Sequence, residues 1–277
     1  MSQGQGREFG LGIEYCYPTI NGNAIRLLGI SPGGQGEPLN CYFDIRDLQE
    51  GQLENLRFVA LSWRQDSAVR ESFRRVAMPV DPVWSDRVFI TQDHSRSELP
   101  IHPSLLKALR HLRDVHEAVV VWVDQLCINY IDTTEAEVQL ELIPEIFRRA
   151  SEVMVWLGES SDDSTLAMQF IPDLLNLDLV DTLVKQESTP VKWRALINLM
   201  QRPYFSRRWV FLELMLAKRA VLYCGSHFVD WGDFADAVVI LGSRYDEVKL
   251  VVRAAVSLEY VARLLSHNLS SISLLSD

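Results

Sequence analysis

The stretch AVVVWVDQLCIN, residues 118–129, decides the fold class. Residues 118–123 form an apolar run of strand length that ends directly at the polar Asp124. An amphipathic segment with Ser104 as its expected N-cap precedes this run, and another follows over residues 134–150. The order helix, buried strand, helix predicts an α/β fold.

The same alternation continues along the chain. Residues 58–63 (FVALSW), 152–157 (EVMVWL) and 220–224 (AVLYC) are three further candidate buried strands. Helical segments are expected over residues 160–184, 206–218, 233–241 and 246–265. Short apolar strands that alternate with amphipathic helices predict a parallel sheet flanked by helices on both faces.

Three regions are expected along the chain. Two strands, at residues 24–30 and 39–45, make residues 1–57 a β-rich N-terminal extension. The core covers residues 58–225 and includes a small hairpin near residues 88–101. Residues 226–277 form a C-terminal helical segment that packs on the core.

Composition excludes several classes of protein. The 27 Lys and Arg against 37 Asp and Glu give a net charge of −10 without a basic stripe, so nucleic acid is not expected as a partner. No run of about 18 apolar residues and no N-terminal signal core is present, which predicts a cytoplasmic protein without a membrane span. Four widely spaced cysteines predict neither a metal site nor a disulfide framework.

Three ordered blocks resemble the fungal heterokaryon-incompatibility (HET) domain. They are ALSW at residues 60–63, WVDQLCIN at residues 122–129 with Asp132 and Glu135, and RPYFSRRWVFLE at residues 202–213. The resemblance covers about residues 58–225. It implies a role in a self/non-self cell-death response.

HET domains are regarded as distant relatives of TIR domains, and two segments are similar to TIR elements. Residues 58–66 resemble the first TIR strand, and residues 206–214 resemble the TIR helix that carries a Trp and, four residues later, a Glu. This likeness implies a flavodoxin/TIR-like fold and cleavage of the nicotinamide glycosidic bond of NAD. Glu213 would then be the catalytic acid, with Trp209 beside it.

The helix itself gives independent support to Glu213. Positions 209 and 213 lie one turn apart on the same face, and apolar neighbours draw the Glu213 carboxylate into a partly dry site. The alternative is a structural ion pair between Glu213 and Arg149, Arg207 or Arg208.

Polar and aromatic side chains at the predicted strand ends are candidates for binding a substrate. Each has a structural alternative: Asp124 as a loop cap, Cys127 as a small buried residue, Arg64 as a solvated strand end, and the tryptophans as core. The candidate set is Ser62, Trp63, Arg64, Asp124, Cys127, Asn129 and Trp209.

Two functions remain open from the sequence. The first is a cell-death effector domain that hydrolyses NAD or a related nucleotide when copies of the chain assemble, with NAD as substrate and no cofactor. The second is a non-enzymatic self-association module of a fungal self/non-self recognition protein. Both predict a homo-oligomer and a regulatory partner domain or protein.

Overall fold

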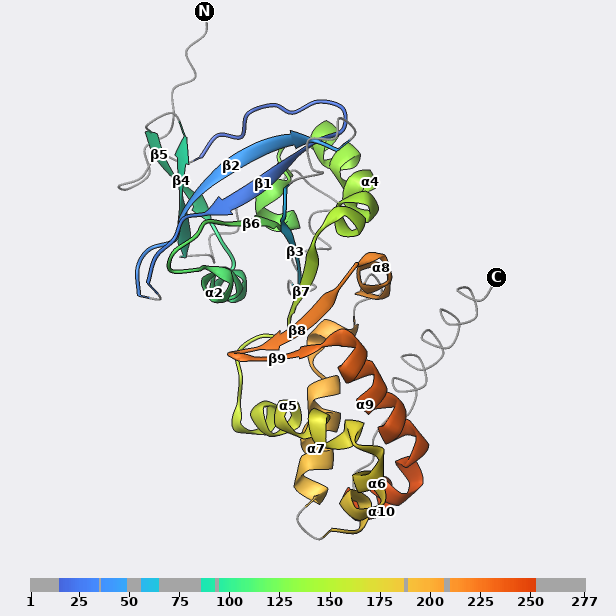
Figure 1. Cartoon of the computed structure of the whole chain (residues 1–277). Coiled ribbons are helices and arrows are strands. Elements are labelled where there is room, and N and C mark those ends of the chain that lie inside the picture. Colours follow the sequence, from blue (N-terminus) through green and yellow to red (C-terminus); the bar gives the residue numbers. More distant parts are fainter. Residues whose placement is uncertain are drawn as a thin grey trace, which may run out of the picture. The chain divides into compact units, whose positions relative to one another are not determined.

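The computed structural model forms two compact units. The first comprises Met1–Met154 with Glu213–Arg219, and the second comprises Val155–Leu212 with Ala220–Asp277. Figure 1 labels most of the elements of both. The structure describes residues 15–34, 36–48, 56–64, 86–92, 95–186, 189–206 and 210–252.

The first unit is built around a mixed sheet. Its strands are β1 (Ala24–Ile30), β2 (Asn40–Asp47), β3 (Val59–Trp63), β4 (Arg87–Gln92), β5 (Ser95–Pro100), β6 (Val119–Trp122) and β7 (Glu152–Trp156), the last of which crosses the unit boundary. The strand order is β5-β4-β2-β1-β6-β3-β7. β3 is parallel to β6 and β2 is parallel to β4, whereas β1 is antiparallel to both β2 and β6.

The strand positions predicted from the sequence are confirmed, but the prediction of a purely parallel sheet is wrong. β1 shows why: all of its residues after Ala24 are buried, although both of its neighbours run antiparallel to it. A continuous apolar run reports burial on both faces of a strand, and this burial does not depend on strand direction. The predicted N-terminal extension therefore supplies a central strand, since β1 lies between β2 and β6. The predicted region boundaries stay a prediction.

In the first unit α2 (Pro103–Leu112) follows β5, and α3 (Asp124–Cys127) and then α4 (Thr133–Arg149) follow β6. The N-cap of α2 is His102 and not Ser104 as predicted, because the His102 Nδ1 atom accepts the Ser104 N–H at 3.1 Å and Pro103 occupies the first helical position. α4 is capped by Asp132 and continues through Pro144 to Arg149.

α4 packs on the sheet face that carries Trp122. The Trp122 and Phe147 rings meet edge to face at 5.8 Å, and the Gln139 Nε2 atom donates to the Ala24 carbonyl at 2.7 Å. The apolar residue Leu140 is 48% exposed. The buried side of α4 instead includes the polar residues Glu135 and Gln139.

The second unit combines a hairpin with stacked helices. β8 (Ala220–Cys224) and β9 (His227–Asp230) are antiparallel, and α5 packs against both α7 and α9. Phe170 of α5 and Trp193 of α7 meet edge to face at 5.0 Å. The helices are α5 (Asp162–Leu175), α6 (Leu177–Lys185), α7 (Pro190–Met200), the 3-10 turn η1 (Pro203–Ser206), α9 (Trp231–Ser243) and α10 (Tyr245–Val252).

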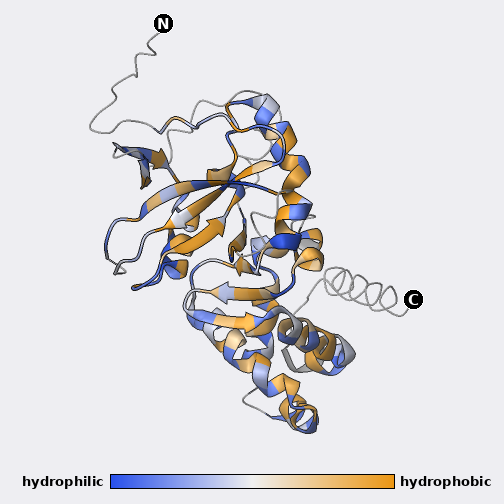
Figure 2. Ribbon diagram, turned by 45° about the horizontal axis from the view of Figure 1, so that its top comes forward, coloured by the Kyte–Doolittle hydropathy of each residue, from blue (hydrophilic) through white to orange (hydrophobic). Residues whose placement is uncertain are grey.

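Two predicted helices are interrupted. The segment over residues 160–184 is divided at Asn176 into α5 and α6. The segment over residues 206–218 is represented by η1 and by α8 (Val210–Leu216), and residues 207–209 lie outside the described residues. Figure 2 shows hydrophobic residues along the central strands, as expected for strands covered on both faces. Along the helices, hydrophobic and hydrophilic residues alternate.

Candidate functional site

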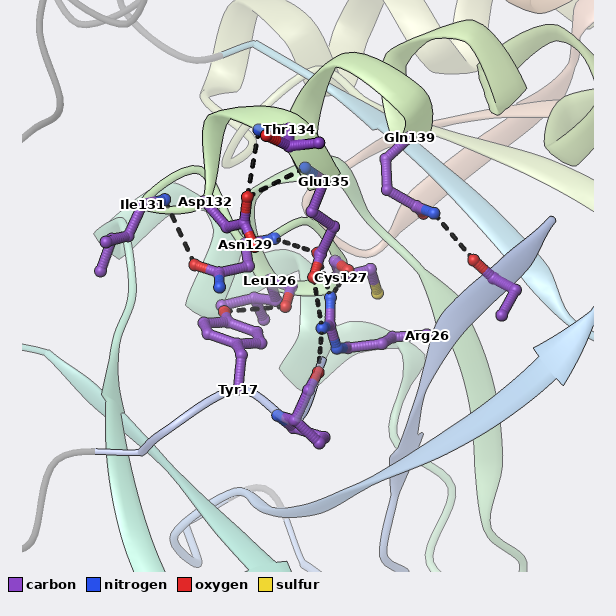
Figure 3. A network of polar contacts seen from close by, with 12 residues as sticks. Tyr17, Arg26, Leu126, Cys127, Asn129, Ile131, Asp132, Thr134, Glu135 and Gln139 are labelled. Carbon is purple, nitrogen blue, oxygen red and sulfur yellow. Dashed lines mark hydrogen bonds and ion pairs between the residues drawn. The ribbon is translucent and has the colours of Figure 1, made fainter. Parts of the chain in front are cut away.

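A buried ion pair holds the segment that follows β6. We name residues 124–135 the signature turn; it contains α3 and the start of α4. Arg26 of β1 reaches Glu135 of this turn with two hydrogen bonds, from Nη1 to Oε1 at 2.5 Å and from Nη2 to Oε2 at 2.8 Å (Figure 3). The Arg26 side chain is 0% exposed and that of Glu135 is 4% exposed. This bidentate geometry fixes the orientation of both groups.

The same network satisfies the backbone of the turn. Arg26 Nη1 donates to the Cys127 carbonyl at 3.3 Å, and the Tyr17 hydroxyl donates to the Leu126 carbonyl at 2.9 Å. The Asn129 N–H donates to Glu135 Oε1 at 3.1 Å (Figure 3). The backbone carbonyls at the end of α3 therefore accept hydrogen bonds from Tyr17, which precedes β1, and from Arg26, which lies in β1. These bonds hold α3 against the sheet.

Two of the candidate binding residues have structural contacts in this turn. The Asn129 side-chain oxygen accepts the Ile131 N–H at 3.2 Å, which is the bond of a local turn. The Cys127 side chain is completely buried and its sulfur accepts the Val123 N–H at 3.5 Å. Burial raises the pKa of the Cys127 thiol to about 12, which suits a packing role better than a nucleophilic one. Substrate binding by either residue stays a prediction.

Ser62 and Glu213 meet at the end of β3. Ser62 is the fourth residue of β3 and Glu213 lies in the middle of α8. The Ser62 hydroxyl donates to Glu213 Oε2, and the two residues are 2% and 8% exposed. The apolar composition of α8 predicted this burial of an acid. A hydroxyl donor in a dry position stabilises the carboxylate and fixes its orientation.

The alternative partners of Glu213 are placed only in part. The Arg149 Nε atom donates to Glu145 Oε1 at 2.6 Å, one turn back along α4. Arg207, Arg208 and the candidate Trp209 lie outside the described residues.

Trp63 and Asp124 form a second contact at the same strand end. The Trp63 Nε1 atom donates to Asp124 Oδ1 at 3.2 Å, and the Trp63 ring lies 5.2 Å from that of His102, the N-cap of α2. Trp63 is 4% exposed, while Asp124 and Arg64 are half-buried. Successive strand residues point to opposite faces of a sheet, so Trp63 and Ser62 belong to opposite sides of β3.

The predicted cluster of strand-end residues is therefore divided between two faces. In the parallel register of β3 and β6, Ala60 is aligned with Trp122, so Ser62 lies on the face that α4 covers. Glu213 shares that face through its bond to Ser62, and Trp63 with Asp124 forms the contact on the side of α2.

Arg26 was not singled out by the sequence analysis. Its signal is the single charge in the otherwise apolar run AIRLLGI of β1. An arginine inside a buried strand requires a buried acceptor, but the sequence does not show which of the acids supplies it.

Two features are absent from the described residues. The described residues contain no group of three or more His, Cys, Asp or Glu side chains that could hold a metal ion. In the part of the chain that the structure describes, no helix has the length and apolar character needed to cross a membrane.

Comparison with known proteins agrees with the resemblance of the three sequence blocks. Residues 58–213, more than half of the chain, match the family model described as heterokaryon incompatibility protein (HET). Over 204 residues the chain is 28% identical to heterokaryon incompatibility protein 6, OR allele, of Neurospora crassa. This alignment covers 61% of the chain and 28% of that longer protein. No solved structure matches the chain. The chain belongs to the heterokaryon incompatibility (HET) family.

Proposed function

We propose that this chain is a cytoplasmic cell-death effector domain of heterokaryon incompatibility that hydrolyses NAD or a related nucleotide at its N-glycosidic bond. The observation that carries the proposal is the buried hydrogen bond between Ser62 and Glu213 at the end of β3. Ligands of α/β sheets bind at the carboxyl ends of strands, which is where this acid lies.

The reaction needs a fixed negative charge beside the ribose. Cleavage of the bond between ribose C1′ and the nicotinamide nitrogen releases neutral nicotinamide and leaves positive charge on the ribose. Water then adds to C1′, and ADP-ribose and a proton are formed. The Glu213 carboxylate, oriented by the Ser62 hydroxyl, would stabilise this charge or hold a ribose hydroxyl.

The proposed likeness to TIR domains is carried by two elements. β3 ends in Ser62-Trp63 and is followed by Arg64, and Glu213 of α8 accepts a hydrogen bond from Ser62. The mixed sheet departs from a purely parallel flavodoxin-like arrangement, so the likeness concerns the site more than the whole fold. Self-association of copies is the proposed trigger, as in the sequence-based hypothesis.

The experiment is an assay of nicotinamide release from NAD by the purified 277-residue chain across a range of protein concentrations. We expect release by wild type that rises more steeply than protein concentration. Glu213→Gln should lower the rate by about a hundredfold or more. Glu137→Gln, an exposed acid on α4, is the matched control and should leave the rate unchanged. An inactive wild type, or equal rates for the two variants, contradicts the proposal.

A second function is supported by the signature turn. Several of its polar groups are engaged in contacts within the protein, including Glu135 with Arg26 and the Asn129 amide with Ile131 (Figure 3). This favours a non-enzymatic module that signals by assembly. Expression in a fungal host, combined with light scattering of the purified chain, separates the two functions. Cell death that needs assembly but is retained by Glu213→Gln would favour the module.

A further inference from the structure

One side chain near the signature turn has an unusual lack of partners. Among the described residues, Gln125 is the one side chain whose buried donor and buried acceptor, Nε2 and Oε1, both lack a hydrogen-bond partner. Gln139 also has an unpaired oxygen, but its nitrogen donates to the Ala24 carbonyl. Arg26 has an unpaired Nε, but its other two nitrogens bind Glu135.

An unpaired amide in a dry position is costly for folding. It loses its bonds to water and gains none in return, so most buried polar groups in proteins are paired. Replacing the amide by an apolar group of the same shape would remove this cost. The two unpaired atoms at this position leave one donor and one acceptor that a ligand could satisfy.

The position of Gln125 in the fold is that of a ligand site. It is the second residue of α3, directly after Asp124, at the carboxyl end of β6. β6 is the parallel neighbour of β3, the strand that ends in Ser62 and Trp63. Adjacent strands are about 4.8 Å apart, so Gln125, which follows β6, and Ser62, near the end of β3, lie at the carboxyl ends of neighbouring strands. The residue as a whole is half-buried, while its two amide atoms are themselves buried.

We propose that the Gln125 carboxamide recognises the substrate by pairing with a planar ligand edge that carries a donor beside an acceptor. A glutamine amide offers the complementary acceptor and donor in one plane. NAD contains two such edges, the carboxamide of nicotinamide and the N6–N7 edge of adenine, and glutamine forms bidentate pairs with the latter in nucleic-acid complexes. The naming of NAD rests on the proposed function, but binding can be measured without hydrolysis.

The test measures binding of four small probes to the full chain by ligand-detected NMR and calorimetry. Nicotinamide and AMP carry the required edge; nicotinic acid and IMP lack its amino donor. Wild type should bind nicotinamide more tightly than nicotinic acid, or AMP more tightly than IMP. Gln125→Met should weaken that binding by about ten- to a hundredfold, as expected for loss of a bidentate pair. The probe whose binding is weakened more by Gln125→Met shows whether Gln125 contacts the nicotinamide end or the adenine end of the nucleotide.

Thermal unfolding of the same variants provides the second measurement. Gln125→Met should unfold at the wild-type temperature or above it, because it removes an unpaired buried amide. Gln139→Met is the matched control: it should unfold at a lower temperature, since it loses the bond to Ala24, and it should bind the probes as wild type does.

Each outcome decides the inference separately from the proposed function. Wild type that binds none of the probes, or a Gln125→Met variant that binds them equally, overturns the inference. A Gln125→Met variant that does not fold also overturns it, since the amide then has a structural partner. Probe binding that depends on Gln125 without NAD hydrolysis refutes only the reaction. NAD hydrolysis that is unchanged in Gln125→Met refutes only the recognition.

Discussion

Removal of the charge on Glu135 should destabilise the first unit strongly. Glu135→Gln keeps the shape of the side chain but leaves the Arg26 guanidinium, 0% exposed, without its countercharge. Breaking a buried ion pair by changing one partner costs about 3–5 kcal/mol. A unit of roughly 150 residues loses about 2–4 °C of melting temperature per kcal/mol, so we expect a fall of about 6–20 °C.

The assay is thermal and urea unfolding followed by circular dichroism. Glu145→Gln is the matched control on the same helix, because Glu145 pairs with Arg149 at the surface and its loss should cost less than about 1 kcal/mol. The double variant Arg26→Met with Glu135→Leu should be more stable than Glu135→Gln alone, since it leaves no buried charge unpaired. A Glu135→Gln variant within 1 kcal/mol of wild type, or a double variant less stable than Glu135→Gln alone, would refute this reasoning.

Three further predictions concern single features of the fold. In native protein at pH 8, a thiol reagent should label Cys16 alone, and all four cysteines after unfolding, since the other three are buried. Gly225→Ala should destabilise the second unit by about 1–2 kcal/mol or more, since Gly225 has φ +56° and a Cβ there would lie 2.5 Å from Ser160 Oγ. Gly232→Ala, whose Cβ meets no atom closer than 3.7 Å, should leave the melting temperature unchanged or raise it. A fragment limited to residues 58–213 should fail to fold in a circular dichroism measurement, because it lacks the central strand β1.

The positions of strands and helices could be predicted because burial leaves a direct trace in composition. The runs at residues 58–63, 118–123 and 152–157 are short and apolar, and β3, β6 and β7 lie within them. Strand direction left no such trace. β1 is apolar because both its faces are covered, and the sequence does not record that its second neighbour is the antiparallel β6.

Part of the candidate site could also be predicted. The spacing of α8 and its apolar neighbours indicated a buried Glu213, and the structure places that acid at 8% exposure against Ser62. The sequence analysis placed the strand-end residues in one cluster and missed that they lie on two faces of the sheet. This could have been foreseen, because Ser62 and Trp63 are adjacent in one strand and successive side chains of a strand point to opposite faces. Arg26 was missed because its partner Glu135 is more than 100 positions away, and a contact of that range depends on the fold.

Several polar side chains of the signature turn make contacts that hold the turn in place, so they are less suited to bind a ligand. Glu135 is engaged by Arg26, the Cys127 thiol is enclosed, and the Asn129 amide oxygen closes its own turn. A ligand that used them would have to break the contacts that hold α3 on the sheet. The side chains of Glu213 and Gln125 make none of these contacts: Glu213 accepts the Ser62 hydroxyl of β3, and the two amide atoms of Gln125, which follows β6, have no hydrogen-bond partner among the described residues. Changes at Glu135 should therefore lower stability, and with it any activity. Glu213→Gln, which can still accept the Ser62 hydroxyl, and Gln125→Met should leave the unfolding temperature near that of wild type, and this contrast in stability can be measured before the substrate is known.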